Sequence, residues 1–279
     1  MYSRAVWGFT DLVIFDCDST LSSIEGIDEL AHMTGSQNAI SALTKRAMEG
    51  DIPLESVYGK RLEVAQPTLS QVQAITELYQ QNVIPDAQAV VQALTAAGCK
   101  VFIVSGGLIE PVRAFGEWLG IPSDHIYAVD MKYDQLSGDW WRYWEQHGGK
   151  NPSANYLGVG ESPLAGTGGK NRVIDYIRTQ HSGRAMLVGD GASDLEAAGH
   201  VDWFVGFGGV VKRQKVQAES PVFLHSLALS PLLPLVIGKH FLPESAKAIY
   251  ADGLARIQLG ELTMKDPTQM ANFLQAVLD

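Results

Sequence analysis

Cysteine is scarce in this chain. Its 279 residues include only Cys17 and Cys99, and each lies within an apolar run. Two cysteines cannot build the disulfide framework of a secreted scaffold, and a structural zinc site would need several further ligands. We therefore expect a reducing, cytoplasmic setting in which neither kind of cross-link holds the fold together.

Positive charge is also in short supply. Lys and Arg total 21 against 31 Asp and Glu, which gives a formal net charge of -10. No block of basic residues offsets this deficit. Because binding to nucleic acid requires clustered cations that neutralise phosphates, the composition argues against a nucleic-acid partner.

Long hydrophobic runs are missing. The longest apolar stretch, residues 227–238, is interrupted by Pro231 and Pro234 and is shorter than the roughly 20 residues of a membrane-spanning helix. Near the N-terminus, Asp11 and Asp16 flank a run of only four apolar residues, unlike an export signal. The chain is 46% hydrophobic, so we expect a sizeable buried core and no membrane partner.

Alternating strands and helices dominate the pattern. Strands that alternate with helices are joined by right-handed crossovers, so we expect an α/β fold with a doubly wound parallel sheet. Ligands of such sheets bind at the carboxyl ends of the strands, where this chain has small and acidic residues. The predicted strands are residues 12–16, 100–104 and 185–190, and the predicted helices are 85–98, 108–120, 171–180 and 193–200.

The remaining segments predict two additions to this core. Residues 22–84 show repeated helical spacing without a convincing strand, and we interpret them as a helical-bundle cap inserted over the strand ends. The α/β catalytic core then comprises residues 1–21 and 85–224. Residues 225–279 are largely helical in pattern and form a C-terminal extension to which no motif assigns a role.

The pattern is less regular after the second predicted strand. Residues 129–144 alternate around Ser137 and Gly138, which predicts a β-hairpin. Residues 147–169 are rich in Gly, Pro, Ser and Asn, a composition typical of a long loop. Long loops are more often functional or mobile than neutral.

Two aspartates, Asp16 and Asp18, follow the first predicted strand in the sequence FDCDST. The pair suits catalysis or metal binding, although a turn that caps a helix uses the same residue types. A calcium-binding EF-hand loop would need Gly at its sixth position and Glu at its twelfth. Leu21 and Ile27 stand there instead, which excludes that kind of site.

Ser105, Gly106 and Gly107 follow the second predicted strand and directly precede a helix. A hydroxyl and free backbone N–H groups at a helix start suit an anion, and the same triplet also serves as a plain helix cap. The nucleophile elbow of serine hydrolases needs a glycine two residues before the serine. Ile103 occupies that position, so this chemistry is disfavoured.

Lys170 ends the sequence GTGGK before a predicted helix. A lysine at this position faces either an anion or solvent. A nucleotide-binding Walker loop would need Gly where Leu164 stands and Ser or Thr where Asn171 stands. The chain fails both conditions, which excludes a nucleoside triphosphatase of that class.

Asp190 and Asp194 lie four residues apart in VGDGASD, after the third predicted strand. Without a basic neighbour, two carboxylates at this spacing repel each other unless a cation lies between them. The motif therefore indicates a loop that binds a divalent cation or an ordinary acidic turn.

Taken in order, FDCDST, SGG, GGK and GDGASD resemble the four motifs of the haloacid dehalogenase-like phosphatases. The resemblance implies a Rossmann-like core with a cap and hydrolysis of a phosphate monoester through an aspartyl-phosphate. EGIDELA, KRAMEG, KRLEVAQP and the stretch after GDGASD are similar to the branch of this family that hydrolyses O-phospho-L-serine, the last step of serine biosynthesis. On this resemblance, the partner is a small phosphoamino acid.

The resemblance also implies roles for the acidic residues. Asp16 is the expected nucleophile, and Asp18 is the expected general acid and base. Mg²⁺ is the implied cofactor, bound by the side chains of Asp16 and Asp190 and by the backbone carbonyl of Asp18. Asp194 is expected to orient Lys170 or a metal-bound water.

Substrate contacts follow from the same resemblance. Lys170, the Ser105 hydroxyl and the Gly106 N–H are expected to hold the phosphoryl group. Glu25 is expected to meet the substrate ammonium and Arg61 its carboxylate. The implied substrate-binding residues are Glu25, Met48, Arg61, Ser105, Gly106, Gly107 and Ser193.

The chain departs from the family pattern in four places. Glu49 stands where Gly is common, which bears on the contact between cap and substrate, and Ser193 stands where Thr is common. The loop from about residue 143 to residue 169 is longer than the pattern, and residues 225–279 lie beyond it. Either of the last two segments could gate the site or mediate assembly.

Sequence alone leaves other functions open. A phosphotransferase of the same fold would use phosphoserine as donor and an alcohol such as homoserine as acceptor, through the same aspartyl-phosphate. A non-catalytic phosphoamino-acid sensor would bind without turnover, which the intact Asp16 and Asp18 argue against. A monomer and a homodimer are both compatible with the sequence.

Overall fold

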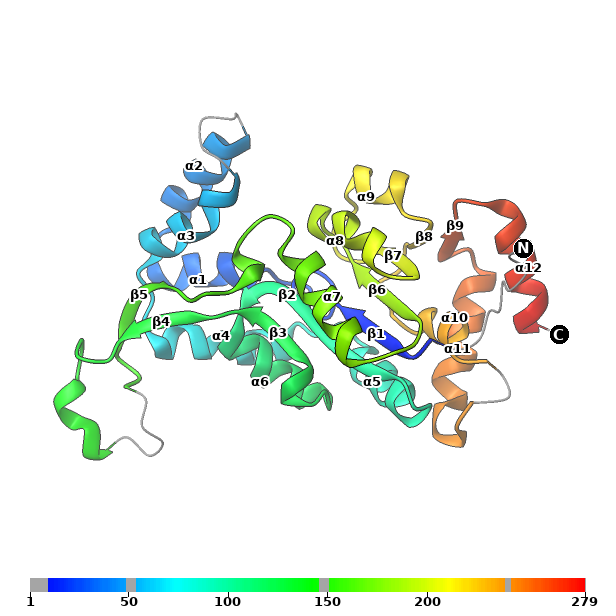
Figure 1. Cartoon of the computed structure of the whole chain (residues 1–279), viewed down its shortest axis with the longest axis horizontal. Coiled ribbons are helices and arrows are strands. Elements are labelled where there is room, and N and C mark those ends of the chain that lie inside the picture. Colours follow the sequence, from blue (N-terminus) through cyan, green and yellow to red (C-terminus); the bar gives the residue numbers. More distant parts are fainter. Residues whose placement is uncertain (1–9, 49–53, 146–150, 239–241, 279) are drawn as a thin grey trace.

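The computed structural model describes residues 10–48, 54–145, 151–238 and 242–278, and it centres on one seven-stranded sheet (Figure 1). The strand order is β3-β2-β1-β6-β7-β8-β9, and only the β8–β9 pair is antiparallel. The predicted doubly wound parallel sheet is therefore confirmed, with β9 as an antiparallel strand at one edge. The strands are β1 (Leu12–Phe15), β2 (Lys100–Leu108), β3 (Ile126–Val129), β6 (Ala185–Gly189), β7 (Trp203–Phe207), β8 (Val222–Leu224) and β9 (Leu262–Met264).

Helices cover both faces of the sheet, and the central strand shows why. All four residues of β1 are buried, as expected for a parallel strand packed on both sides. Val13 and Phe15 belong to one hydrophobic cluster, whereas Leu12 and Ile14 belong to another. The first cluster includes α5 (Ala87–Ala96) and α6 (Ile109–Leu119), and the second includes α7 (Gly169–Gln180), α8 (Ala192–Ala197) and α9 (Gln214–Glu219).

Four helices occupy the described residues between β1 and α5. Among them, α2 packs against α3, and α4 packs against α6 of the sheet layer. In Figure 1, α2 and α3 project away from the sheet at one end of the molecule. The four helices are α1 (Gly26–Thr34), α2 (Gln37–Met48), α3 (Leu54–Ala65) and α4 (Leu69–Gln81).

The β-hairpin expected within residues 129–144 is wrong. Strand β4 (Met131–Asp134) pairs antiparallel with β5 (Asn155–Val159), which lies in the segment expected to be a loop. The connection between the two strands is longer than a tight hairpin turn, and Asn151 Nδ2 donates to the Ser137 carbonyl across it at 2.7 Å. Within this connection, residues after Ser137 form the 3-10 segment η2 (Trp140–Glu145) instead of a returning strand.

The C-terminal segment is tied to the sheet. Its described residues contribute three helices and also strand β9, which the sequence did not predict. The Asp86 carboxylate accepts hydrogen bonds from the backbone N–H groups of Leu229 and Ser230 at 2.8 Å, which fastens this segment next to α5. The helices are α10 (Leu232–Val236), α11 (Lys247–Gln258) and α12 (Pro267–Leu278).

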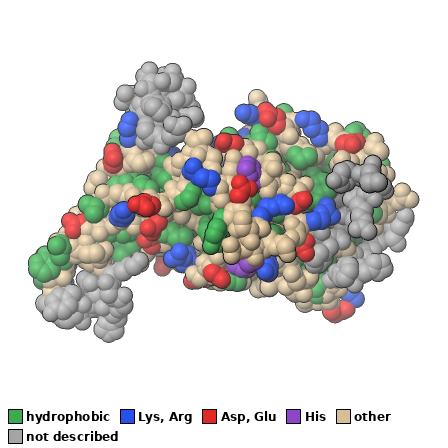
Figure 2. All heavy atoms as spheres, in the orientation of Figure 1, with side chains coloured by type: hydrophobic (Ala, Val, Ile, Leu, Met, Phe, Trp, Pro, Cys, Tyr) green, Lys and Arg blue, Asp and Glu red, His purple; other side chains and the backbone are tan. Residues whose placement is uncertain are grey.

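Short 3-10 turns complete the described elements. They are η1 (Ser123–His125), η3 (Pro163–Ala165), η4 (Ala198–His200) and η6 (Glu244–Ala246). Over the described ranges, no helix is both long and apolar enough to cross a lipid bilayer. On the face shown in Figure 2, Lys and Arg side chains are interspersed with Asp and Glu side chains over the part of the chain that the structure describes.

Candidate active site

A cavity of about 220 Å³ opens at the carboxyl ends of β1, β2 and β6, beneath α1 and α3. Parallel strands end at one edge of the sheet, so residues far apart in the sequence meet there. Helices from the inserted segment supply the opposite wall. Of the residues singled out from the sequence, those lining this cavity are Asp16, Asp18, Glu25, Arg61, Gly106, Gly107, Lys170, Asp190 and Ser193.

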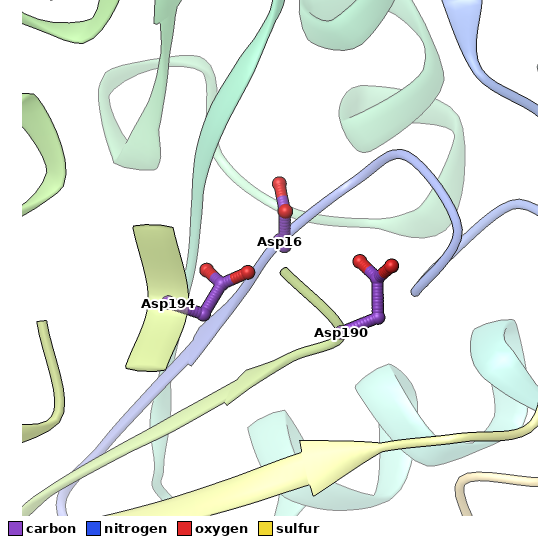
Figure 3. A group of neighbouring side chains, drawn as sticks. All are labelled: Asp16, Asp190 and Asp194. Atoms are coloured by element: carbon purple, nitrogen blue, oxygen red, sulfur yellow. The ribbon is translucent and has the colours of Figure 1, made fainter. Parts of the chain in front are cut away.

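Three buried carboxylates converge beside this cavity (Figure 3). Asp16 directly follows β1, Asp190 directly follows β6, and Asp194 lies on α8. One ligand oxygen of each lies within 4.8 Å of the other two. Oxygen ligands at this spacing are those that hard divalent cations prefer, so these residues can hold a metal ion.

Lys170 lies between two of these carboxylates. Its Nζ is 2.7 Å from Asp16 Oδ2 and 2.6 Å from Asp194 Oδ1, and the lysine side chain is only 5% exposed. Burial by itself lowers the pKa of the Lys170 ammonium, but the two carboxylates outweigh burial and raise the pKa above its ordinary value. The second oxygen of Asp194 accepts a hydrogen bond from the Gly191 N–H at 3.1 Å. Asp194 thus contacts the cation of Lys170 with one oxygen and the Gly191 backbone with the other.

Asp18 is a carboxyl held by two donors. Its Oδ1 accepts a hydrogen bond from the Gly26 N–H at 2.7 Å and another from the Tyr79 hydroxyl at 2.7 Å. Burial, together with the negative charges of Glu25 and Asp16, raises the pKa of Asp18 to about 7, although the two donors oppose the rise. A carboxyl with such a pKa can exchange a proton near neutral pH, as a general acid and base must.

Ser105, Gly106 and Gly107 lie within β2, near its carboxyl end, and not after the strand as the sequence predicted, and the two glycines line the cavity. The Ser105 hydroxyl is buried and accepts a hydrogen bond from the Gly107 N–H at 3.0 Å. A β-carbon on Gly107 would lie 2.9 Å from Asp18 Oδ2. Glycine at position 107 therefore leaves room for that carboxylate, whereas a β-carbon on Gly106 would meet nothing within 4 Å.

Arg61 and Glu25 lie on the side of the inserted helices. Arg61 comes from α3, its guanidinium lies 5.9 Å from the centre of the Tyr58 ring, and its buried Nε has no hydrogen-bond partner among the described residues. Glu25 precedes α1 and accepts a hydrogen bond from the Ser19 hydroxyl at 2.8 Å. Burial raises the pKa of Glu25 above its ordinary value.

Two residues from the sequence analysis are not fully described. Met48 is the last residue of α2, but its side chain lies outside the described part of the structure. Glu49, the departure from the family pattern, lies outside the described residues altogether.

Sequence reasoning missed two residues of the site, Arg213 and Tyr79. Arg213 Nε lies 2.9 Å from Asp190 Oδ2, and its Nη2 lies 3.5 Å from Glu25 Oε1. Arg213 follows a predictable strand, β7, and so reaches the same sheet edge, which is the signal that could have found it. No motif marks Tyr79, which lies on α4 and touches Asp18 only through folding of the chain.

This fold and this acidic site are those of a haloacid dehalogenase-like hydrolase, and the model of that family matches residues 10–143. The phosphoserine phosphatase of Bos taurus is 35% identical over 216 residues, which cover 77% of this chain and 88% of the relative. The phosphoserine phosphatase of Homo sapiens is 34% identical over the same shares. The chain therefore belongs to the phosphoserine phosphatase family within the haloacid dehalogenase-like hydrolases.

A solved structure agrees with this fold. The phospho-aspartyl intermediate analogue of a phosphoserine phosphatase matches with a TM-score of 0.63 and 22% sequence identity, over 82% of this chain and 99% of that one. At this identity, the match shows that the two proteins share a fold.

Proposed function

We propose that the chain hydrolyses O-phospho-L-serine to L-serine and phosphate, as the last step of serine biosynthesis. The observation that carries the proposal is the buried Nε of Arg61, which has no hydrogen-bond partner among the described residues, in a cavity that Asp16 and Lys170 also line. Asp16 and Lys170 suit a phosphoryl group. Arg61 offers a cation for a carboxylate, and Glu25 offers an anion for an ammonium group.

The first half of the reaction uses Asp16 and Asp18. Asp16 attacks phosphorus, the bond from phosphorus to the serine oxygen breaks, and Asp18 gives that oxygen a proton. The products of this half are free serine and a phosphorylated Asp16. Splitting one difficult displacement into two easier ones is the advantage of a covalent intermediate.

The second half regenerates the enzyme. Asp18 now lacks its proton and accepts one from a water molecule, which attacks the phosphorylated Asp16. The bond from phosphorus to the Asp16 oxygen breaks and phosphate leaves. Asp18 ends this half protonated and ready for the next substrate.

Mg²⁺ is the proposed metal, and the donor set fits it because every available ligand atom is oxygen. The side chains of Asp16 and Asp190 and the backbone carbonyl of Asp18 would hold it. When bound, the ion would neutralise charge on the phosphoryl oxygens. Lys170, the Ser105 hydroxyl and the Gly106 N–H would supply the remaining stabilisation of that charge.

The inserted helices are proposed to recognise the amino-acid part of the substrate. Glu25 and Arg61 bind its ammonium and carboxylate groups, Ser193 lines the pocket, and Gly107 leaves room for Asp18. The family resemblance adds Met48 as a further substrate-binding residue. We also propose that the protein acts in the cytoplasm as a monomer or homodimer. The two cysteines are buried and free, as a reducing compartment allows.

Replacement of Arg61 should weaken substrate binding more than loss of charge explains. We expect Arg61→Lys to raise KM for phosphoserine about tenfold and Arg61→Ala about 100-fold, because a lysine cannot form the two parallel bonds of a guanidinium. Steady-state phosphate release measures both. KM for phosphoethanolamine, which lacks the carboxylate, should change by about twofold or less in either variant.

Arg113→Lys is the matched control, since Arg113 is exposed on α6 and does not line this cavity. It should leave KM for phosphoserine unchanged. If Arg61→Ala raised KM equally for phosphoserine and phosphoethanolamine, Arg61 would not bind the carboxylate.

A substrate screen tests the proposed function as a whole. Phosphate release is measured from phosphoserine, phosphothreonine and sugar phosphates, with Mg²⁺ and then with a chelator. Phosphoserine should be the preferred substrate, and chelation should stop turnover. Preference for a sugar phosphate or turnover without metal would refute the proposal. An added alcohol acceptor such as homoserine should not divert the phosphoryl group, since the curated relatives are named phosphatases.

A further inference from the structure

The two oxygen atoms of Asp18 have different surroundings. Oδ1 accepts hydrogen bonds from the Tyr79 hydroxyl and from the Gly26 N–H, each at 2.7 Å. Oδ2 lies on the other side, where a β-carbon on Gly107 would approach it to 2.9 Å. One oxygen is therefore held by the inserted helices, while the other lies beside the glycines of the expected phosphoryl pocket.

Tyr79 is fixed firmly enough to impose this arrangement. Its side chain is fully buried, and its ring lies 5.4 Å from that of Phe115 on α6. The absence of a side chain at Gly26 is also needed, because a β-carbon there would overlap the Tyr79 hydroxyl. The hydroxyl therefore has a set position relative to β1 and the residues that follow it.

This arrangement decides which oxygen more readily carries a proton. A carboxyl oxygen that accepts from two donors can carry a proton only if one of them becomes an acceptor. The Gly26 N–H cannot accept, and the Tyr79 hydroxyl would have to turn its own hydrogen away from Asp18 to do so. A proton on Asp18 is therefore favoured on Oδ2, the atom that lies beside Gly107. Without the Tyr79 hydroxyl, only the Gly26 N–H would hold Oδ1, and the carboxyl group would be less firmly oriented.

We propose that Tyr79 is a positioning residue for Asp18, which it holds with Oδ2 toward the oxygen of the leaving group. The inference rests on the proposed function, because it concerns the proton that Asp18 gives to serine. Tyr79 does not touch the substrate in this account. It acts through Asp18. Proton transfer from Asp18 to the leaving group therefore depends on how α4 packs against α6.

The test is the variant Tyr79→Phe, which keeps the ring and removes only the hydroxyl. Single-turnover formation of the phosphoenzyme is measured with phosphoserine and with acetyl phosphate, whose leaving group departs as a stable anion and needs no proton. The phosphoserine rate should fall about tenfold, as for loss of one hydrogen bond to a charged group. The acetyl phosphate rate should stay within about twofold, and KM for phosphoserine should not change.

A second measurement separates positioning from a general structural role. Tyr79→Phe is repeated in an Asp18→Asn background, where a residue that acts only through Asp18 should have no further effect on the phosphoserine rate. Tyr250→Phe is the matched control, because the hydroxyl of Tyr250 is buried on α11 and has no hydrogen-bond partner among the described residues. That control should keep wild-type rates.

The outcomes separate the two ideas. If the wild-type protein fails to turn over phosphoserine, the proposed function is wrong. If the wild-type protein turns it over and Tyr79→Phe matches it, the positioning role alone is wrong. The positioning role would also be wrong if Tyr79→Phe slowed phosphoenzyme formation equally with phosphoserine and with acetyl phosphate. It would be wrong, too, if Tyr79→Phe slowed the phosphoserine reaction further in the Asp18→Asn background. Both outcomes would leave the proposed function standing.

Discussion

Asp16→Asn should reduce hydrolysis of phosphoserine by about 10⁴-fold or more, because an amide oxygen cannot replace a carboxylate nucleophile. The change is nearly isosteric. The new side chain can still accept the 2.7 Å hydrogen bond from the Cys17 N–H, and Lys170 keeps its contact with Asp194. The variant should therefore fold, and its loss of activity should reflect chemistry. Phosphate release under saturating substrate and Mg²⁺ measures the effect.

The same variant also tests the intermediate. With phosphoserine labelled in its phosphoryl group, acid quenching should trap label on the wild-type protein and none on Asp16→Asn. Asp139→Asn is the matched control, since Asp139 is exposed and remote from the cavity, and it should label normally. Label on Asp16→Asn, or substantial turnover by it, would place the nucleophile at another residue.

The convergence of the central acidic residues could be predicted because it follows from a rule about parallel sheets. Asp16 and Asp190 directly follow β1 and β6, and Ser105 lies in β2 two residues beyond Ile103, the partner of the last residue of β1. The register pairs β1 with both β2 and β6. Adjacent parallel strands bring their carboxyl ends to one edge, so the sequence pattern of three strands was sufficient to place these residues together.

Contacts made by the inserted helices were beyond that rule. The hydrogen bond from the Tyr79 hydroxyl to Asp18 joins residues that are 61 positions apart in the sequence. It depends on how α4 packs against α6. No local pattern encodes that packing. Arg61 and Glu25 were reached only through the family resemblance, since a charged residue on a helix ordinarily faces solvent.

Short strands paired far along the chain were missed for a related reason. The three residues of β9 are stable only as the edge partner of β8, and β5 pairs with β4 across an intervening turn and 3-10 segment. In both cases tertiary pairing overrides a weak local signal. The predicted hairpin was wrong because β4, whose alternating sequence suggested it, pairs with β5 and not with the residues directly after the turn.

Lys170→Met should destabilise the protein as well as inactivate it. Removing one partner of a buried ion pair leaves uncompensated buried charge, so we expect the free energy of unfolding to fall by about 3 kcal/mol in the presence of a chelator. Turnover of phosphoserine should fall about 10³-fold, because the cation closest to the reacting group is lost. Urea denaturation and phosphate release measure the two effects. Lys132→Met, at an exposed lysine on β4, should change neither.

The pH dependence of that loss identifies its cause. Burial raises the pKa of Asp194, and Lys170 opposes the rise, so the variant should have a higher pKa for this carboxyl in the folded state. A group whose pKa is raised on folding binds more protons in the native state, and its contribution to stability is lost as the pH increases. The loss of unfolding free energy in Lys170→Met should thus be larger at about pH 8 than at about pH 5.

Added Mg²⁺ should stabilise the variant more than the wild-type protein, since the ion would restore positive charge among the three carboxylates. A deficit that is equal at both pH values and indifferent to Mg²⁺ would mean that lost packing of the lysine stem, and not unpaired charge, accounts for the destabilisation.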